Sequence, residues 1–229
     1  MNGASPGLHA PSLVEATTRQ LREEILTGQL APGERLIEEQ IRQRFAISRA
    51  PLREALRSLA QQGLVEHLPR RGTRVTELSP VEIDQLFGIR LVLEEHAITS
   101  TFPMTEPPDA RRLAEVNHWL DLMRRADRMG DELRKDDAHR ALHAAIVGLA
   151  GNRQLDLALE PILLKLQRPM AVNLRREAQV DGAQAGIERH ERLVAALATN
   201  DSATILTELH SHGTRRFLPS RRSAGLTQL

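Results

Sequence analysis

The sequence predicts a mainly α protein with an N-terminal winged helix-turn-helix and a C-terminal all-α bundle of six helices. Apolar residues recur at helical spacing along most of the chain. Only the stretch around 64–75 has the valines, threonines and Pro-Arg-Arg-Gly turn of a β-hairpin. The composition changes near residue 78, and 229 residues are enough for two domains. We therefore expect a flexible arm at 1–11, a winged domain at 12–78, a helical domain at 79–218 and a flexible tail at 219–229.

Three helices and a two-stranded wing are expected in the winged domain. Gly28 ends the first helix, Gly63 ends the third, and Ser48 is a candidate N-cap for the third. A Pro-Gly turn follows the first helix. The helices are expected at 13–26, 37–45 and 48–62, and the wing at 64–75.

The helical domain begins near Ser79, and every later segment has a helical period without a strand candidate. Short connections separate these segments, which favours antiparallel neighbours and hence a bundle. The six expected helices are 80–102, 108–129, 131–149, 152–176, 182–199 and 201–217.

The composition excludes several classes of protein. No apolar run approaches the roughly 20 residues that span a bilayer, and the first residues lack the order of a secretory signal, so we expect a cytoplasmic protein without a membrane partner. Cysteine is absent, which excludes disulfides, thiolate zinc sites and thiol catalysis. Any metal must therefore be held by nitrogen and oxygen ligands, and nine histidines supply the nitrogens.

Arginines are concentrated in the winged domain. Eight arginines but only two glutamates lie between Arg42 and Val75. Such a basic cluster suits a polyanion, and the alternative interpretation is a solvated charged face.

The third expected helix has the features of a DNA-recognition helix. Arg49, Arg53 and Arg57 are spaced four residues apart and fall on the flank of an apolar stripe. The free N–H groups of the first helical turn favour a phosphate, and arginine can pair with guanine in the major groove. The wing adds three arginines around a glycine that lets the backbone approach DNA: Arg70, Arg71, Gly72 and Arg74.

The segment PGERLIEEQIRQRFAISRAPLREALRSLAQQGLVEHLPRRGTRV resembles the winged helix-turn-helix of the GntR family of bacterial transcription regulators, and the resemblance covers 12–78. It implies that Arg49 and Arg53 contact base edges or phosphates. It also implies that Ser48 binds a phosphate and that Gly72 approaches the minor groove. The full expected DNA-binding set is Arg35, Ser48, Arg49, Arg53, Arg57, Arg70, Arg71, Gly72 and Arg74.

Three positions depart from the family pattern. Arg42 stands where alanine is usual, Ala46 where glycine turns the chain, and Ala50 where threonine is common. We therefore expect a slightly altered turn and no hydroxyl contact from position 50.

His139 and His143 lie four residues apart on an expected helix, so that two imidazoles on one face could chelate an ion. The alternative is two polar residues on a solvated face. The enzyme form of this spacing has glutamate after the first histidine, but Arg140 occupies that position, which argues against a metal-dependent hydrolase. Further ligands could come from the last two helices, where His190 and His212 lie; His210 and His212 cannot both face the core.

Residues 79–229 resemble the FCD domain, a helical bundle with a buried metal that follows this type of DNA-binding domain. The resemblance implies that His143, His190 and His212 are metal ligands. His139 stands where the family has aspartate, so the fourth ligand is either His139 or Asp136, one turn earlier. Because an imidazole replaces a carboxylate, we expect a divalent transition metal, zinc or nickel.

The same resemblance implies an effector site. Arg90 would pair with an effector carboxylate, although an ion pair within the helix with Glu94 is an equal alternative. Asn173 either lines the cavity or is a surface amide. We expect a homodimeric repressor of the VanR-like branch that binds a palindromic operator and responds to a small organic acid. The alternatives are a direct metal sensor without an organic effector and, less favoured, a metal-dependent hydrolase.

Overall fold

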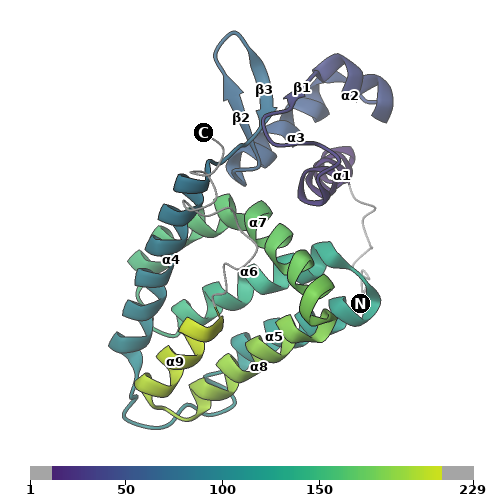
Figure 1. Ribbon diagram of the computed structural model, residues 1–229. Helices are drawn as coiled ribbons and strands as arrows, with labels where there is room; N and C mark the ends of the chain where they lie inside the picture. The colour runs from purple at the N-terminus through teal and green to yellow at the C-terminus, as the bar shows by residue number, and fades with distance from the viewer. Residues whose placement is uncertain (1–11, 213–229) are drawn as a thin grey trace, which may run out of the picture. The chain divides into compact units, whose positions relative to one another are not determined.

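The computed structural model describes residues 12–212, which fall into two compact units that meet between Glu77 and Leu78. Each unit has its own helices and its own buried core. Figure 1 labels the helices and strands of both units. The expected arm and the C-terminal tail, with His9, lie outside the described residues.

The N-terminal unit contains three helices and a small sheet. Helix α3 packs against α1 and α2 through a stripe of buried side chains, among them Leu52, Leu56 and Leu59. This stripe is the apolar face expected from the helical period, and burial of such a face holds most short helices in place. The elements are α1 (Leu13–Thr27), β1 (Arg35–Leu36), α2 (Glu38–Phe45), α3 (Arg49–Gln61), β2 (Val65–Leu68) and β3 (Gly72–Val75).

The expected hairpin is present as β2 and β3, and a third strand that was not expected, β1, extends it to a sheet of three. Strand β1 pairs antiparallel with β3, in the strand order β1-β3-β2, with Arg35 opposite Arg74. A strand of two residues shows no apolar alternation, and only its partner makes it recognisable.

Two details of the turn before α3 bear on the departures from the family pattern. Ala46 ends α2 in the left-handed region at φ 52°, so the glycine-type conformation is kept without a glycine. Ser48 does occupy the N-cap position of α3, but its side chain makes no capping hydrogen bond.

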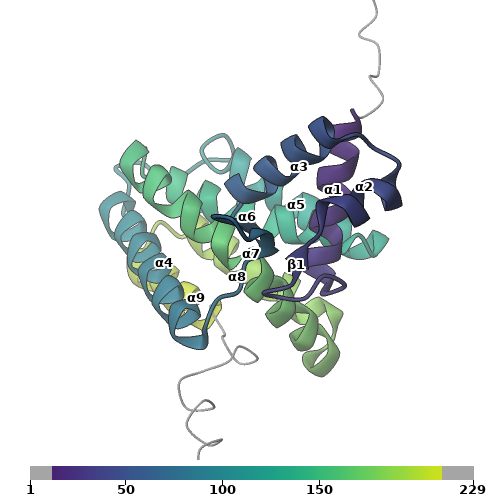
Figure 2. The same ribbon diagram turned by 90° about the horizontal axis from the view of Figure 1, so that it is seen from above.

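The C-terminal unit contains the six expected helices, and no strand is present among its described residues. Helices α4 and α7 lie side by side and antiparallel, because Phe87 packs near Leu166 while Ala97 packs near Leu159 (Figures 1 and 2). Helices α5, α6, α8 and α9 enclose a second part of the core. The bounds are α4 (Pro80–Thr101), α5 (Ala114–Met129), α6 (Glu132–Gly148), α7 (Arg153–Asp181), α8 (Ala183–Ala198) and α9 (Ser202–His212).

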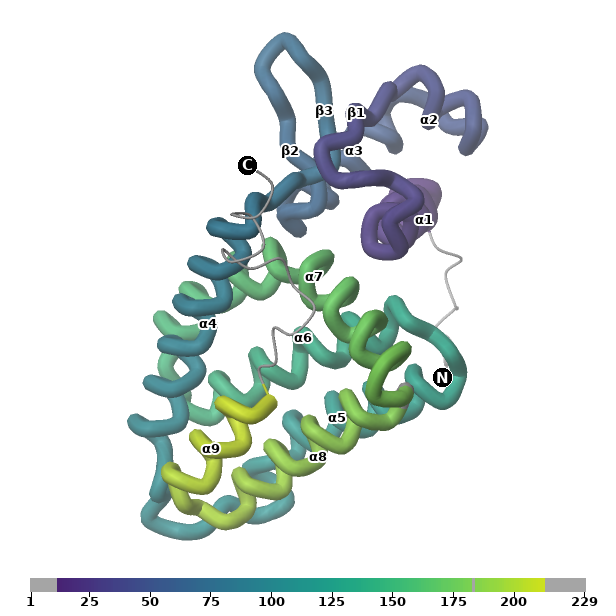
Figure 3. Tube along the Cα trace, viewed as in Figure 1, coloured from purple at the N-terminus to yellow at the C-terminus, as the bar shows by residue number. Residues whose placement is uncertain are grey.

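Two helix ends differ from those expected. Helix α5 begins six residues late, because Asp109 accepts a hydrogen bond from the backbone N–H of Arg112 and holds a turn before the helix. Helix α7 continues five residues further, to Asp181, although it contains Pro161 and Pro169. The trace in Figure 3 follows α7 as one continuous helix. No helix between residues 12 and 212 is long and apolar enough to cross a membrane.

Candidate metal centre, effector cavity and DNA-binding surface

Four histidines from three helices converge inside the C-terminal unit. His139 and His143 come from α6, His190 from α8 and His212 from α9. One ring nitrogen from each histidine faces the others, and these four nitrogens all lie within 4.8 Å of one another. All four side chains are buried, and His190 is 0% exposed. Residues that are far apart in the sequence thus form one cluster.

Two of these imidazoles have an oxygen close behind the ring. Nδ1 of His143 lies 3.0 Å from Oε1 of Glu94, and Nδ1 of His190 lies 2.5 Å from the carbonyl oxygen of Gly186. These acceptors favour a proton on Nδ1, which leaves the lone pair on Nε2 of each ring. Nε2 of His190 is buried and has no partner within residues 12–212. A carboxylate or carbonyl behind the ring is the usual support of a metal-binding histidine.

The spacing of the nitrogens also suits an ion. Nε2 of His143 lies 2.9 Å from Nε2 of His212. Two nitrogens bound at about 2.1 Å to one tetrahedral ion lie about 3.4 Å apart, so a small shift of the two rings would let both bind it. The residues present therefore fit a divalent metal with imidazole ligands.

Burial keeps the four imidazoles neutral, the form that binds metal. It lowers the pKa of His139, His143, His190 and His212, and charged neighbours such as Arg90 lower each pKa further. Each ring is thus a neutral ligand at physiological pH.

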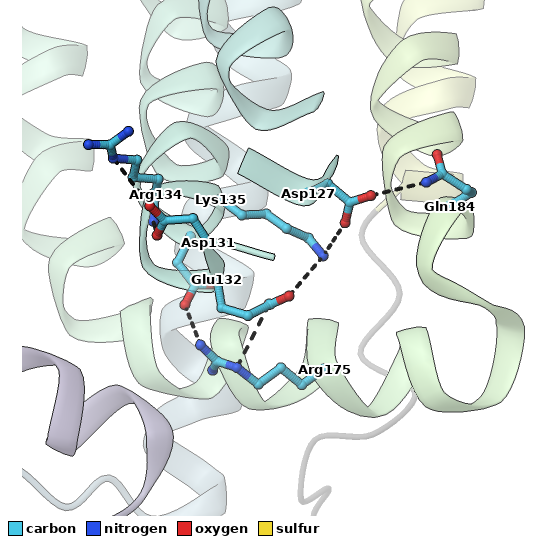
Figure 4. A network of polar contacts seen from close by, with 8 residues as sticks. Asp127, Asp131, Glu132, Arg134, Lys135, Arg175 and Gln184 are labelled. Atoms are coloured by element: carbon cyan, nitrogen blue, oxygen red, sulfur yellow. Dashed lines mark hydrogen bonds and ion pairs between the residues drawn. The ribbon is translucent and has the colours of Figure 1, made fainter. Parts of the chain in front are cut away.

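The two candidates for the fourth ligand are separated in the structure. His139 belongs to the histidine cluster, with its ring centroid 4.8 Å from those of His143 and His190. Asp136 instead has its Oδ2 2.8 Å from Nη2 of Arg175. Arg175 also lies near Glu132, at one side of the polar network in Figure 4. The geometry therefore favours a four-histidine set over one with Asp136.

The polar network of Figure 4 joins α6 to its neighbours. Nζ of the buried Lys135 is 2.7 Å from Oδ1 of Asp127 on α5, and Gln184 on α8 donates to the other oxygen of Asp127 at 3.1 Å. The ion pair of Asp136 on α6 with Arg175 on α7 adds a third helix to the network. These contacts hold in place the helix that carries His139 and His143.

Only one of the two histidines near the end of α9 faces the core, as expected. His212 is 6% exposed, whereas His210 is exposed and pairs with Glu95 at 2.6 Å. His96 and His118 are exposed on their helices and lie outside the cluster.

A cavity of about 220 Å³ opens beside the cluster. His139, His190 and His212 form part of its wall, and Arg90 and Asn173 line it as well. The ion pair within the helix is present, since Nε of Arg90 is 2.8 Å from Oε1 of Glu94. Arg90 also lines the cavity, and its contact with an effector stays a prediction. The pair is buried, so it differs from the weak surface pair that the spacing alone suggested.

Two further charged residues of this site were missed from the sequence. Arg189 on α8 lines the cavity, and its guanidinium pairs with Glu177 on α7, which is 3% exposed. A charged residue on a helix is normally solvated, and nothing in the local sequence marks Glu177 as buried. Only the packing of α7 against α8 reveals the pair.

The arginines of α3 are exposed on the flank of its buried stripe. Arg53 and Arg57 expose 65% and 64% of their side chains, and Arg49 is also exposed. Arg53 lies 3.4 Å from Glu38, and Arg57 lies 2.6 Å from Glu54. Exposed pairs of this kind are weak, so a phosphate or base can replace the glutamates.

The wing adds a second basic edge to the same unit. Its turn contains Arg70 and Gly72 with positive φ, at 61° and 85°, and Arg71 between them is exposed. Pairing of β1 with β3 places Arg35 beside Arg74, and Nη2 of Arg35 would lie 3.8 Å from a β-carbon at position 72. The third strand therefore brings Arg35 to the wing, which the sequence did not show.

The winged unit and the helical unit define a DNA-binding transcription regulator rather than an enzyme. Residues 13–75 match the model of bacterial regulatory proteins of the gntR family, and residues 85–215 match that of the FCD domain. The chain belongs to the GntR family, in the subgroup that carries an FCD domain.

Relatives and solved structures agree with this assignment. The chain is 31% identical to the HTH-type transcriptional regulator YdhC of Bacillus subtilis, over 62% of this chain and 63% of that protein. It is 27% identical to the HTH-type transcriptional repressor GlaR of Escherichia coli, over 85% of this chain and 89% of the repressor. A GntR regulator from Rhodococcus sp. RHA1 has the same fold, with a TM-score of 0.66 and 24% identity over 88% of this chain and 94% of its own.

Proposed function

We propose that this chain is a metal-containing, effector-controlled repressor that acts as a homodimer on a palindromic operator in the cytoplasm. The observation that carries the proposal is the buried four-histidine cluster that opens onto a cavity of small-molecule size. GlaR and the gluconate operon repressor of Bacillus subtilis, a relative 25% identical over 84% of this chain and 79% of its own length, are both named as repressors, which supports the sign of regulation.

DNA contact is assigned to the basic edges of the winged unit. We place Arg49, Arg53 and Arg57 in the major groove and on its phosphates, with Ser48 at a phosphate beside the start of α3. The wing would contact the adjacent backbone and minor groove through Arg35, Arg70, Arg71, Gly72 and Arg74. Two copies of the unit on one duplex would read two half-sites, which is why we propose a homodimer.

Metal binding is assigned to His139, His143, His190 and His212. Imidazole ligands suit zinc, nickel and related ions better than oxygen-seeking ions such as magnesium. When bound, the ion supplies a positive centre at the cavity wall to which an acidic effector can bind. Glu94 and the carbonyl of Gly186 orient two of the rings.

The effector would act by shifting an equilibrium between two arrangements of the protein. An acid bound between the metal centre and Arg90 would stabilise one arrangement of the helical unit over another, and operator affinity would change with it. The ligand must bind the two arrangements with different affinities for this to occur.

The metal content of purified protein tests the assignment. We expect wild-type protein to hold about one divalent ion per chain. His143→Ala should lose it during purification, because the three remaining imidazoles bind the ion more weakly than four. His96→Ala, an exposed histidine on α4, is the control and should keep the metal. A His143→Ala protein with unchanged metal content would contradict the site.

Operator binding is tested separately by gel shift of genomic fragments. Arg49→Ala and Arg53→Ala should each weaken binding, and Arg192→Ala, exposed on α8, should not.

A direct metal sensor is the second candidate function, since a sensor of this kind requires only the metal centre. In that case chelator and metal alone would switch operator binding, and carboxylates would have no effect.

A further inference from the structure

We propose that Asp136 supports the metal centre through a water molecule, which lies in a small cavity between α6 and α7 and joins its carboxylate to the ring of His139. This inference rests on the proposed function, because it adds a residue behind one of the proposed ligands. Asp136 lies one turn before His139 on α6 and would be a positioning residue, since it acts on the metal only through that ring.

The small cavity has the size and the lining of a site for one water molecule. Its volume is about 20 Å³, which exceeds the roughly 10–15 Å³ that one water needs and is too small for two. Asp136, His139 and Gln167 line it with polar groups, and apolar residues of α7 form much of the remainder. A buried water makes about three hydrogen bonds to groups of this kind. The small cavity is therefore suited to a bridging water.

Asp136 is the carboxylate that such a water would reach. Among the described residues that line the small cavity, it is the one acidic side chain, and 9% of that side chain is exposed. Its Oδ2 accepts a hydrogen bond from Nη2 of Arg175 at 2.8 Å. A carboxylate can accept about four hydrogen bonds, so this ion pair leaves room for a water that donates to Asp136.

His139 lacks the direct support that two other rings of the cluster have. Glu94 lies behind His143, and the carbonyl of Gly186 lies behind His190, whereas within residues 12–212 no protein oxygen hydrogen-bonds to His139. His139 lines the effector cavity and the small cavity as well. With one nitrogen directed at the cluster, the N–H on its other nitrogen can donate to a water in the small cavity.

The bridge would return a carboxylate to the metal centre. His139 stands where the resemblance to the FCD domain expects aspartate, so the charge of that ligand is absent from this chain. An acceptor behind a metal-binding imidazole fixes its orientation and raises its basicity, which strengthens its bond to the metal. Asp136 would supply this effect from a distance of one water, while its pair with Arg175 holds the carboxylate in place.

The zinc affinity of the full-length protein, measured by competition with a chromophoric chelator, tests the role of Asp136. Asp136→Asn should weaken zinc binding by about tenfold, the lower end of the effect of a residue behind a metal ligand, because a water intervenes. Asp137→Asn is the matched control, since the neighbouring carboxylate does not line the small cavity, and it should keep the wild-type affinity.

Two further variants separate this role from that of an ion pair that only joins α6 to α7. Arg175→Gln removes the pair and keeps the carboxylate, so it should bind zinc at least as tightly as wild type. In a His139→Ala background, Asp136→Asn should change the zinc affinity by less than about twofold, because the effect of Asp136 passes through His139. A crystal structure of the zinc-loaded protein should show one ordered water within hydrogen-bond distance of both residues.

The outcomes separate the inference from the proposed function. Wild-type zinc affinity in Asp136→Asn would overturn the inference and leave the four-histidine site intact. An equal loss of affinity in Arg175→Gln would show that the ion pair, and not the water, carries the effect. A full effect of Asp136→Asn without His139, or a zinc-loaded structure without the bridging water, would overturn the proposed route. Wild-type protein that binds no zinc would overturn both the inference and the proposed metal site.

Discussion

Glu94 is the carboxylate that links the two parts of the C-terminal site. Burial by itself raises the pKa of Glu94, but Arg90 and His143 lower it to about 2, so the group is ionised at neutral pH. It contacts a cavity residue through one interaction and a histidine of the cluster through another. Its position places a negative charge beside the all-imidazole cluster.

Glu94→Gln should weaken metal binding by about 10–100-fold, because the charged partner of the His143 ring is lost. Competition with a chromophoric chelator measures the affinity. Glu95→Gln, the next residue on α4, is the matched control and pairs with His210 rather than with the cluster. Equal metal affinities of the two variants would show that Glu94 does not support His143.

The buried histidines make the stability of the metal-free protein depend on pH. In the unfolded chain each imidazole takes up a proton as the pH falls through about 6.5, whereas burial lowers the pKa of all four in the folded chain. The unfolded state then binds more protons, so the free energy of unfolding decreases as the pH is lowered from about 7.5 to about 5.5. Each histidine contributes at most about 1.4 kcal/mol per pH unit.

Denaturation of chelator-treated protein with urea at several pH values across this range measures the slope. His139→Leu removes one titrating group and should give a shallower slope. A free energy of unfolding that is constant across the range would contradict neutral, buried imidazoles.

At the scale of single elements, the wing turn and helix α4 respond in opposite ways to the same substitution. Gly72 has φ 85°, where a side chain is strained, whereas a β-carbon at Gly88 within α4 would meet no neighbouring atom within 4 Å. Gly72→Ala should lower the free energy of unfolding of the winged unit by about 1–2 kcal/mol. Gly88→Ala should raise that of the helical unit by up to about 1 kcal/mol, because alanine favours helix.

Thermal denaturation followed by circular dichroism compares the two variants with wild type. A stabilised Gly72→Ala protein would show that the turn does not need the left-handed conformation. A destabilised Gly88→Ala protein would show that this face of α4 is covered in solution.

Helix ends were the least predictable elements, for a local reason. Helix α5 begins later than expected because Asp109 accepts a hydrogen bond that holds a turn before it. A single hydrogen bond of this kind leaves no periodic pattern in the sequence. Charged residues at the end of α7 continue the helix because Glu177 is buried against Arg189, a contact that depends on another helix.

At the scale of the whole molecule, the metal should stabilise one unit and not the other. A ligand present at about 1,000 times its dissociation constant adds about 4 kcal/mol to the stability of the domain that binds it. All four proposed ligands lie in the C-terminal unit. Excess chelator should therefore lower the melting temperature of that unit by several degrees and leave the winged unit unchanged.

Differential scanning calorimetry with and without chelator resolves the two transitions. His143→Ala should melt at the same temperature under both conditions. A shift of both transitions in wild-type protein would contradict a metal confined to the helical unit.

The sequence by itself determined the class of the protein and much of its candidate site. Helical spacing predicted the helices, and the Arg-rich third helix and the wing predicted a DNA-binding unit. The resemblance to the FCD domain implied the set of His143, His190 and His212. These patterns are local or depend on fixed spacing, so they can be recognised in the sequence without a structure.

Tertiary structure decided the features that depend on contacts between distant segments. It separated His139 from Asp136, because Arg175 on another helix pairs with Asp136. It also brought Arg35 to the wing and buried the pair of Arg189 and Glu177 beside the cavity. The environment of a charged side chain is set by the surfaces packed against it, and these surfaces come from parts of the chain that a local pattern cannot contain.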